Sequence, residues 1–223
     1  MEKYAIVIAG PSGAGKTSVA DALIEKLGNL EMSRSATTRP RRGDGRDDEY
    51  VYLSVGEFEA CISSGCVLEY TNYSGNFYGT RQIELDRIFE NGKIPILVLD
   101  YNGARSLKER LGYPVYAFYI YTDLNEAEKR LIERDIYSCG SDKKKLETFT
   151  KRKMANIEDY LVLCDMAELF DAYVENDVLD CCVSKVALLI DELRHGREVM
   201  SSLEKRDITA SFKKQAVEKS KIQ

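Results

Sequence analysis

The nine residues AGPSGAGKT, from Ala9 to Thr17, most constrain the fold of this 223-residue chain. They fit the pattern G-x-x-x-x-G-K-[ST], which here begins at Gly10 and ends with Lys16 and Thr17. A short apolar run, YAIVI, precedes them, and apolar residues at helical spacing follow, so the motif has its required strand–loop–helix context. Glycines let backbone N–H groups turn inward around phosphate oxygens, and the helix N-terminus adds a favourable dipole. The sequence therefore predicts a loop that binds the phosphates of a nucleotide.

Strand and helix patterns alternate along the rest of the chain. Apolar runs predict strands at Tyr4–Ile8, Ile94–Asp100, Val115–Tyr121 and, more weakly, Ala172–Glu175. Helical spacing runs from Lys16 to near Gly28, follows the strands at 94 and 115, and recurs at Val183–Leu193. We expect an α/β fold with a parallel central sheet in three layers, the P-loop NTPase arrangement. The aromatic segment GCVLEYTNYSGNFYGT predicts a separate small antiparallel sheet, and residues 198–223 are typical of a partly disordered tail or an extra helix.

Composition restricts the partners and the compartment. The net charge of −5 argues against a general attraction to nucleic acid or to an anionic membrane, and no apolar run approaches the roughly 20 residues of a membrane span. The N-terminus lacks the layout of a signal peptide, so we expect a cytoplasmic protein. The six cysteines and single histidine do not have zinc-site spacing. We interpret the cysteines as reduced thiols, most of them small core residues, with Cys181 and Cys182 on different faces of a helix.

Five motifs downstream of the loop occur in the order found in one protein family. SATTRPRR resembles the S-x-T-T-R-x-x-R element of that family, and YVY at Tyr50–Tyr52 resembles its Y-x-F/Y. EYTNYSGNFYGT is similar to E-(x)5-G-N-Y-Y-G-T/S, LDYNGA to D-x-Q-G-A, and ENDVLD to V-N-D-D-L-D. From the loop to about Leu193 the chain therefore resembles the guanylate kinases, the nucleoside monophosphate kinases specific for GMP. The resemblance implies a small β-rich GMP-binding subdomain, a helical lid, and phosphorylation of GMP and dGMP by ATP in purine nucleotide metabolism.

The donor side is expected to lie around the loop. Lys16 would reach the β- and γ-phosphates, and Thr17 would offer its hydroxyl to Mg²⁺, the implied cofactor. The resemblance places Asp100 in the magnesium shell as well as on the acceptor side. The residues expected to bind ATP are Gly10, Pro11, Ser12, Gly13, Ala14, Gly15, Lys16, Thr17, Ser18, Arg130 and Asn176.

The acceptor side must recognise a base and a phosphate. Guanine presents donors at N1 and N2 beside the O6 acceptor, so the Glu69 carboxylate can accept from both donors while the hydroxyls of Ser35 and Thr80 serve O6 and its surroundings. A dianionic phosphate is best bound by several guanidinium or phenol donors. The residues expected to bind GMP are Ser35, Arg39, Arg41, Arg42, Tyr50, Glu69, Tyr78, Thr80, Asp100 and Gly103, and either Arg41 or Arg42 fits the place of the second arginine.

During phosphoryl transfer, negative charge builds on the transferred group and water must be kept out. Further cations are therefore expected on a mobile segment. Arg130 and Arg134 are four residues apart, on one face of a predicted helix, and Arg134 matches the lid arginine of the R-L-x-x-R-G element. Arg152 matches a second lid arginine, and with Lys16, Arg39 and Arg134 it completes the expected catalytic set. We expect one domain at 1–197, with a core (1–32, 82–129, 156–197), a GMP-binding subdomain (33–81) and a lid (130–155), followed by a polar tail (198–223).

The chain departs from the family pattern at four places. Val98 stands where an acidic residue is usual, and Asn102 replaces a glutamine. The arginine element is one residue short before Tyr50, with Asp47 in place of a glycine. The lid between Arg134 and Arg152 is longer than that of the family and lacks the glycine that follows the lid arginine.

Two other functions remain open: a non-catalytic guanylate-kinase-like module that binds peptides, and a kinase for another small phosphorylated acceptor. The intact loop argues against the first, and Glu69 with the Gly79-Thr80 turn argues against the second. The oligomeric state and the donor preference beyond a purine triphosphate are not defined by the sequence.

Overall fold

The computed structural model describes residues 2–41, 47–73, 75–136 and 142–221. The chain forms two compact units. The first comprises Met1–Val7 and Leu23–Val115, and the second comprises Ile8–Ala22 and Tyr116–Gln223. Two strands and one helix therefore begin in one unit and end in the other.

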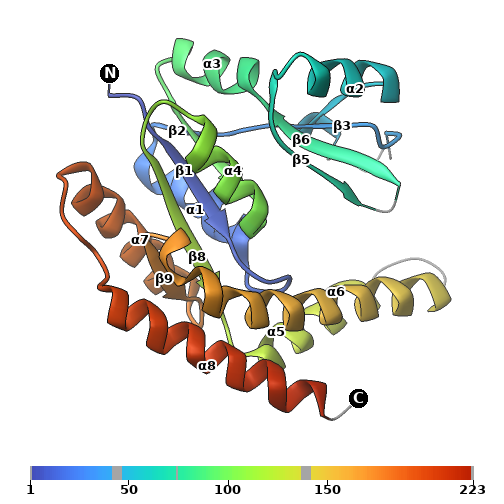
Figure 1. Cartoon of the computed structure of the whole chain (residues 1–223), viewed down its shortest axis with the longest axis vertical. Coiled ribbons are helices and arrows are strands. Elements are labelled where there is room, and N and C mark those ends of the chain that lie inside the picture. Colours follow the sequence, from blue (N-terminus) through green and yellow to red (C-terminus); the bar gives the residue numbers. More distant parts are fainter. Residues whose placement is uncertain (1, 42–46, 74, 137–141, 222–223) are drawn as a thin grey trace. The chain divides into compact units, whose positions relative to one another are not determined.

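The main sheet has five strands in the order β2-β7-β1-β8-β9 (Figure 1). These are β1 (Ala5–Ala9), β2 (Leu30–Met32), β7 (Ile94–Val98), β8 (Val115–Tyr121) and β9 (Ala172–Glu175). In the first unit β2 runs parallel to β7, with Leu30 opposite Ile94, and in the second β8 runs parallel to β9, with Phe118 opposite Ala172. Every residue of β1 is buried, as expected for a strand covered on both faces. The α/β fold with a parallel sheet is confirmed, and each predicted strand lies within two residues of its expected bounds.

The first unit also contains a sheet of four short strands in the order β4-β3-β6-β5. They are β3 (Ser35–Thr37), β4 (Tyr50–Tyr52), β5 (Val67–Tyr73) and β6 (Asn76–Arg81). The predicted antiparallel pair is confirmed as β5 and β6, while β3 runs parallel to β4. Helix α2 (Val55–Ser63) covers this sheet through the fully buried Phe58, whose ring stacks on Phe77 at 5.3 Å. The other helical segments of this unit are η1 (Asp47–Glu49), α3 (Gln82–Glu90) and α4 (Tyr101–Arg110).

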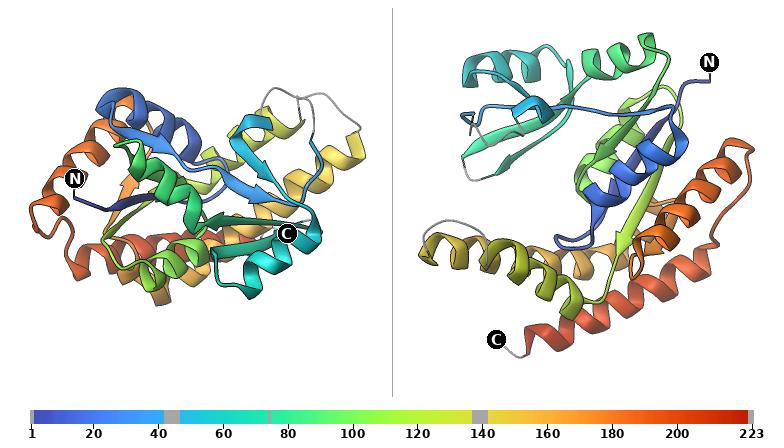
Figure 2. Two further views of the ribbon diagram at one scale, coloured as in Figure 1. Left: turned by 90° about the horizontal axis from the view of Figure 1, so that it is seen from above. Right: turned by 180° about the vertical axis from the view of Figure 1, so that it is seen from behind.

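The second unit is mainly helical around β8 and β9. Its elements are the start of α1 (Lys16–Leu27), α5 (Leu124–Leu131), the π-helical turn η2 (Ile132–Ile136), α6 (Asp142–Val162), η3 (Leu163–Leu169), α7 (Leu179–Arg194) and α8 (Ser202–Ser220). Of the two possibilities for residues 198–223, the structure shows the helix: α8 begins at a capping box between Ser201 and Glu204 and runs beside α6 (Figure 2). Its Phe212 is fully buried and stacks on Tyr160 of α6 at 4.4 Å, so α8 completes the core of this unit.

The cysteines only partly follow expectation. Cys181 is exposed and Cys182 is buried, which confirms that the adjacent pair lies on different faces of α7. The expectation that most cysteines are core residues is wrong for those that the structure describes, because Cys61, Cys66 and Cys164 are partly exposed. Cys139 lies outside the described residues.

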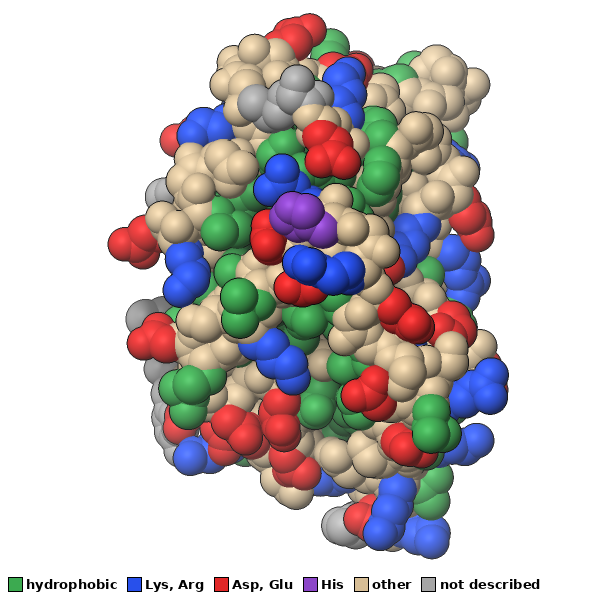
Figure 3. All heavy atoms as spheres, turned by 90° about the vertical axis from the view of Figure 1, so that its left-hand side faces the viewer, with side chains coloured by type: hydrophobic (Ala, Val, Ile, Leu, Met, Phe, Trp, Pro, Cys, Tyr) green, Lys and Arg blue, Asp and Glu red, His purple; other side chains and the backbone are tan. Residues whose placement is uncertain are grey.

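Surface charge is mixed on the face that Figure 3 shows, where acidic and basic side chains alternate over short distances. Within the residues that the structure describes, none of the helices combines the length and apolar character needed to cross a bilayer.

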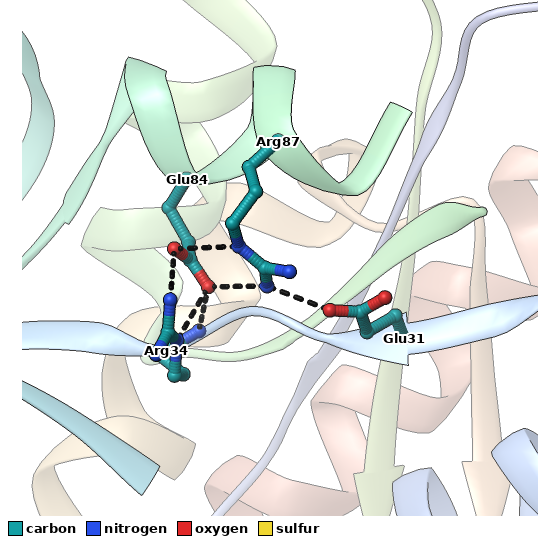
Figure 4. Close-up of polar contacts among 4 residues, drawn as sticks. All are labelled: Glu31, Arg34, Glu84 and Arg87. Atoms are coloured by element: carbon teal, nitrogen blue, oxygen red, sulfur yellow. Dashed lines mark hydrogen bonds and ion pairs between the residues drawn. The ribbon is translucent and has the colours of Figure 1, made fainter. Parts of the chain in front are cut away.

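An ion-pair network around the buried Glu84 ties α3 to the segment that joins β2 and β3 (Figure 4). Glu84 is 3% exposed and accepts hydrogen bonds from Arg34 Nε at 3.0 Å and Nη2 at 3.1 Å. Arg87 donates to both Glu84 oxygens, at 2.8 and 3.2 Å, and to Glu31 at 2.6 Å. These partners outweigh the effect of burial and lower the pKa of Glu84 to about 2.

The network predicts acid sensitivity. Because the pKa of Glu84 is lower in the folded chain than in the unfolded one, its stabilisation is present above about pH 4.5 and is lost as the pH falls towards 2. From this shift we expect Glu84→Gln to lower the free energy of unfolding by about 2–3 kcal/mol at pH 7 and by much less at pH 2.5, measured by urea denaturation. Glu59→Gln, at an exposed site on α2, is the control. A Glu84→Gln penalty that stays constant between pH 7 and 2.5 would contradict the account.

Candidate functional site

The loop between β1 and α1 has a backbone that only glycine can adopt at three positions. Gly10, Gly13 and Gly15 have φ angles of 148°, 89° and 83°. A Cβ atom would lie 2.0 Å from the Ile120 carbonyl oxygen at Gly10 and 2.6 Å from the Ala127 carbonyl oxygen at Gly13. The sequence prediction of a tight loop between a strand and a helix is confirmed.

Two asparagines from distant segments hold the loop. The buried side chain of Asn156 on α6 accepts a hydrogen bond from Ser12 N at 2.7 Å and donates to Ser12 O at 2.8 Å. Asn176, at the end of β9, donates from Nδ2 to Ala14 O at 2.7 Å. Asn176 belongs to the ENDVLD motif and was predicted, whereas Asn156 lies inside a helical pattern 144 residues after Ser12 and has no such signal.

The charged residue of the loop is turned onto the loop itself. Lys16 Nζ donates to the carbonyl oxygens of Gly10 at 2.8 Å and Pro11 at 3.0 Å. Thr17 and Ser18 follow in the first turn of α1 with exposed side chains. The ammonium group of Lys16 therefore lies against the opening of the loop, within a side-chain rotation of an anion bound there.

The expected lid arginines occupy different environments. Arg130 on α5 donates from both terminal nitrogens to the Asn176 carbonyl oxygen at 3.2 Å, so these two predicted residues are together. Arg134 is exposed on the π-helical turn η2, and Arg152 is partly exposed on α6. The two arginines lie on consecutive helical segments, because α5 ends at Leu131 and the π-helical turn η2 carries Arg134.

In the first unit, four predicted residues meet around one carboxylate. Strand pairing places Glu69 of β5 opposite Thr80 of β6, and Thr80 Oγ1 donates to Glu69 Oε1 at 2.6 Å. The side chain of Asp100, at the N-cap of α4, accepts from Gly103 N at 2.7 Å. A Cβ atom at Gly103 would stand 3.3 Å from Glu69 Oε2 and 3.4 Å from Asp100 Oδ1, so the missing side chain leaves room for both carboxylates.

Burial raises the pKa of Glu69, the nearby negative charge of Asp100 raises it further, and the hydrogen bond from Thr80 opposes them. The carboxylate is therefore more easily protonated than an exposed glutamate. A ligand that brought N–H donors to it would favour the charged form.

A second cluster surrounds Arg39. Its Nη2 donates to the Tyr52 hydroxyl at 3.3 Å, and its guanidinium lies 5.0 Å from the Tyr50 ring centre. The Tyr52 hydroxyl in turn donates to Asp47 at 2.7 Å, and Tyr50 contacts the edge of Tyr78 at 6.2 Å. Arg39 Nη1 is buried and has no hydrogen-bond partner among the described residues, which makes it a donor suited to an anion.

The remaining predicted residues are placed by the strands or fall outside the structure. Ser35 begins β3 next to Ala36, which pairs with Gly79, so Ser35 lies at the strand position beside Thr80. The guanidinium of Arg41 lies over the Tyr52 ring at 4.4 Å. Arg42 lies outside the described residues, and the choice between the two arginines stays open. Tyr52 and its partner Asp47 were not selected as site residues, although the Y-x-F/Y motif contains Tyr52.

The comparison with protein families identifies the chain. The model of the family described as guanylate kinase matches residues 2–193. The chain belongs to this family. It is 32% identical to a guanylate kinase of Lactobacillus acidophilus, covering 83% of this chain and 87% of the relative. It is 35% identical to that of Rubrobacter xylanophilus, covering 77% and 85%.

A solved structure supports the same fold. The crystal structure of guanylate kinase from Anaplasma phagocytophilum covers 91% of this chain and 89% of its own, with a TM-score of 0.59 and 23% identity. The P-loop fold expected for the guanylate kinase family is therefore present. The family match ends at residue 193, so α8 lies beyond it.

The loop geometry predicts that Gly13→Ala is severely destabilising. Gly13 and Gly196 both have positive φ, but a Cβ at Gly13 meets the backbone of Ala127, whereas a Cβ at Gly196 has no atom within 4 Å among the described residues. We expect Gly196→Ala to cost about 1 kcal/mol from backbone strain and Gly13→Ala about 3–5 kcal/mol, measured by chemical denaturation. Equal costs for the two variants would show that the close approach at Gly13 does not constrain the loop.

Proposed function

We propose that the chain transfers the γ-phosphoryl group of ATP to GMP, and also to dGMP, giving ADP and GDP or dGDP. The reaction is a direct in-line transfer, and the protein acts by positioning and electrostatics. Membership of the guanylate kinase family supports the reaction, and the Glu69–Thr80 pair is the single observation that carries the choice of guanine.

The loop supplies the ATP side. Residues Gly10 to Ser18 would surround the phosphates, and the backbone N–H groups that are not already paired within the protein would donate to them. Lys16 would exchange its loop carbonyls for the β- and γ-phosphates. Arg130 and Asn176, which contact each other, would border the nucleotide. Arg134 and Arg152 would neutralise charge on the transferred group, together with Lys16 and Arg39.

The first unit supplies the GMP side. The Glu69 carboxylate would accept the guanine N1 and N2 donors, with Ser35 and Thr80 close to O6. The unpartnered Nη1 of Arg39 would donate to the phosphate, supported by Tyr50, Tyr78 and either Arg41 or Arg42. Asp100 and Gly103 would line the same pocket, since both lie beside Glu69.

The residues present fit Mg²⁺ as the cofactor. Thr17 is exposed at the end of the loop. Asp100 uses its Oδ1 to cap α4, so its other carboxylate oxygen is available to a metal ion. The described residues hold no group of three or more carboxylate, histidine or cysteine ligands. This fits Mg²⁺, which usually binds one or two protein oxygens together with water and substrate phosphates. When bound, the ion would neutralise phosphate charge.

The proposal divides the chain by role. Residues 33–81 would bind GMP and residues 130–155 would close over the phosphates, on the core of 1–32, 82–129 and 156–197, with 198–223 following. Closure would exclude water during transfer. We place the reaction in purine nucleotide metabolism and in the cytoplasm, because the five described cysteines are free thiols, which are typical of a reducing compartment.

A test of acceptor choice separates this function from others on the same fold. Adenine has an acceptor at N1 and a C–H at C2, so it cannot satisfy Glu69, and sites of this kind discriminate by about 10⁴-fold. In a coupled ADP-release assay with GMP, dGMP, AMP, UMP and CMP, we expect kcat/KM for GMP to exceed that for AMP by at least about 10³-fold.

Variants complete the test. Glu69→Gln replaces an acceptor oxygen with a donor, so kcat/KM for GMP should fall by about 10²-fold or more, with little change for AMP. Lys16→Ala should lower kcat by at least about 10²-fold, and Glu59→Gln should change neither. Equal use of AMP and GMP by the parent, or unchanged GMP kinetics in Glu69→Gln, would refute guanine recognition by this residue.

A further inference from the structure

The contact between α6 and the phosphate loop is a two-point clamp. One side-chain amide, that of Asn156, pairs with both backbone groups of Ser12, at 2.7 and 2.8 Å. Figure 1 labels α6, which carries Asn156, and the elements β1 and α1 on either side of the loop. The amide is buried, with 3% of the residue exposed. Paired in both directions, it fixes the rotation of the Ser12 peptide groups as well as their position.

The clamp acts in the glycine-rich part of the loop. Ser12 lies between Gly10 and Gly13, two glycines with positive φ, and glycine backbones have the most conformational freedom to lose. Because the Ser12 N–H is given to Asn156, and the Ala14 N–H to Pro11 O at 3.2 Å, the phosphates are left to other N–H groups of the loop. A loop held in its binding shape before the ligand arrives loses less entropy on binding.

The helix that bears the clamp is itself held from another side. Lys153, three residues before Asn156, donates to Glu128 of α5 at 2.9 Å, and Lys219 of α8 donates to the same carboxylate at 2.6 Å. Arg152 lies one helical turn before Asn156, on the same side of α6. The clamp therefore also fixes the backbone that carries Arg152 with respect to the loop.

We propose that Asn156 is a positioning residue for ATP: it holds the phosphate loop, through Ser12, in the conformation that binds the triphosphate. The inference rests on the proposed function only in naming ATP as the nucleotide. Asn156 touches the loop backbone and need not touch the substrate.

The first test is a pair of variants at neighbouring positions of α6. Asn156→Leu removes both hydrogen bonds at similar volume, and Lys153→Met removes an ion pair of the same helix without touching the loop. By calorimetry, at a temperature where both are folded, we expect Asn156→Leu to raise the Kd for Mg-ATP about tenfold or more and to leave the Kd for GMP within twofold. Lys153→Met should leave both constants unchanged.

A second variant keeps the proposal testable if Asn156→Leu does not fold. Asn156→Asp preserves the acceptor for Ser12 N but turns a carboxylate oxygen towards Ser12 O, next to the phosphate site. Its Kd for Mg-ATP should exceed that of the parent at pH 8.

The outcomes separate this inference from the proposed function. Parent-like ATP binding by folded Asn156→Leu or Asn156→Asp, or an equal loss of GMP binding, would overturn the positioning role. A parent that binds Mg-ATP but does not phosphorylate GMP would overturn the proposed function and leave the binding test of Asn156 intact.

Discussion

A partly buried carboxylate with an acidic neighbour is the constraint around which the proposed acceptor site is built. Glu69 is placed by the pairing of β5 with β6, and its stabilising partner is the Thr80 hydroxyl at 2.6 Å. Burial and Asp100 both disfavour its charge. Two glycines, Gly79 and Gly103, let the backbone approach Glu69 closely. A Cβ atom at Gly79 would lie 2.5 Å from the Glu69 carbonyl oxygen. Burial and Asp100 destabilise the charged carboxylate in the free protein, and hydrogen bonds from the two N–H donors of guanine would offset them.

The phosphate loop is held in place in a different way. It has almost no side chains with which to pack, so its shape is imposed from outside, by close backbone contacts at Gly10 and Gly13 and by the amides of Asn156 and Asn176. Neutral amides hold the loop without placing a negative charge beside the phosphates. The Lys16 ammonium group donates to loop carbonyl oxygens, from which it can turn to a bound anion.

Local signals carried most of the fold and much of the candidate site. Four of the five strands of the main sheet are short runs rich in β-branched or aromatic residues, whereas β2 (Leu30–Met32) has no such pattern and was not predicted. The loop and the Glu69–Thr80 pair are each defined by spacing within one motif. The contacts that sequence analysis missed join distant segments. In the sequence, Asn156 is an ordinary polar residue of a helical pattern, and only the fold brings it to Ser12. The Glu84 network likewise requires Arg34, fifty residues earlier in the chain.

Local patterns did not predict the π-helical turn η2, which follows α5 and carries Arg134. The polarity of residues 198–223 did not distinguish a disordered tail from a helix, because its fit depends on Phe212 meeting tyrosines of other elements. Tertiary packing decided that choice.

The most direct test of guanine recognition is the pKa of the Glu69 carboxyl, measured by NMR on ¹³C-labelled glutamate and assigned with Glu69→Gln. In the free protein the pKa should lie above that of an exposed glutamate, because burial and Asp100 raise it. Saturating GMP should lower it, because two N–H donors stabilise the carboxylate, whereas AMP, which brings the same phosphate charge, should not. A Glu69 pKa that GMP leaves unchanged, or that AMP lowers equally, would contradict the account.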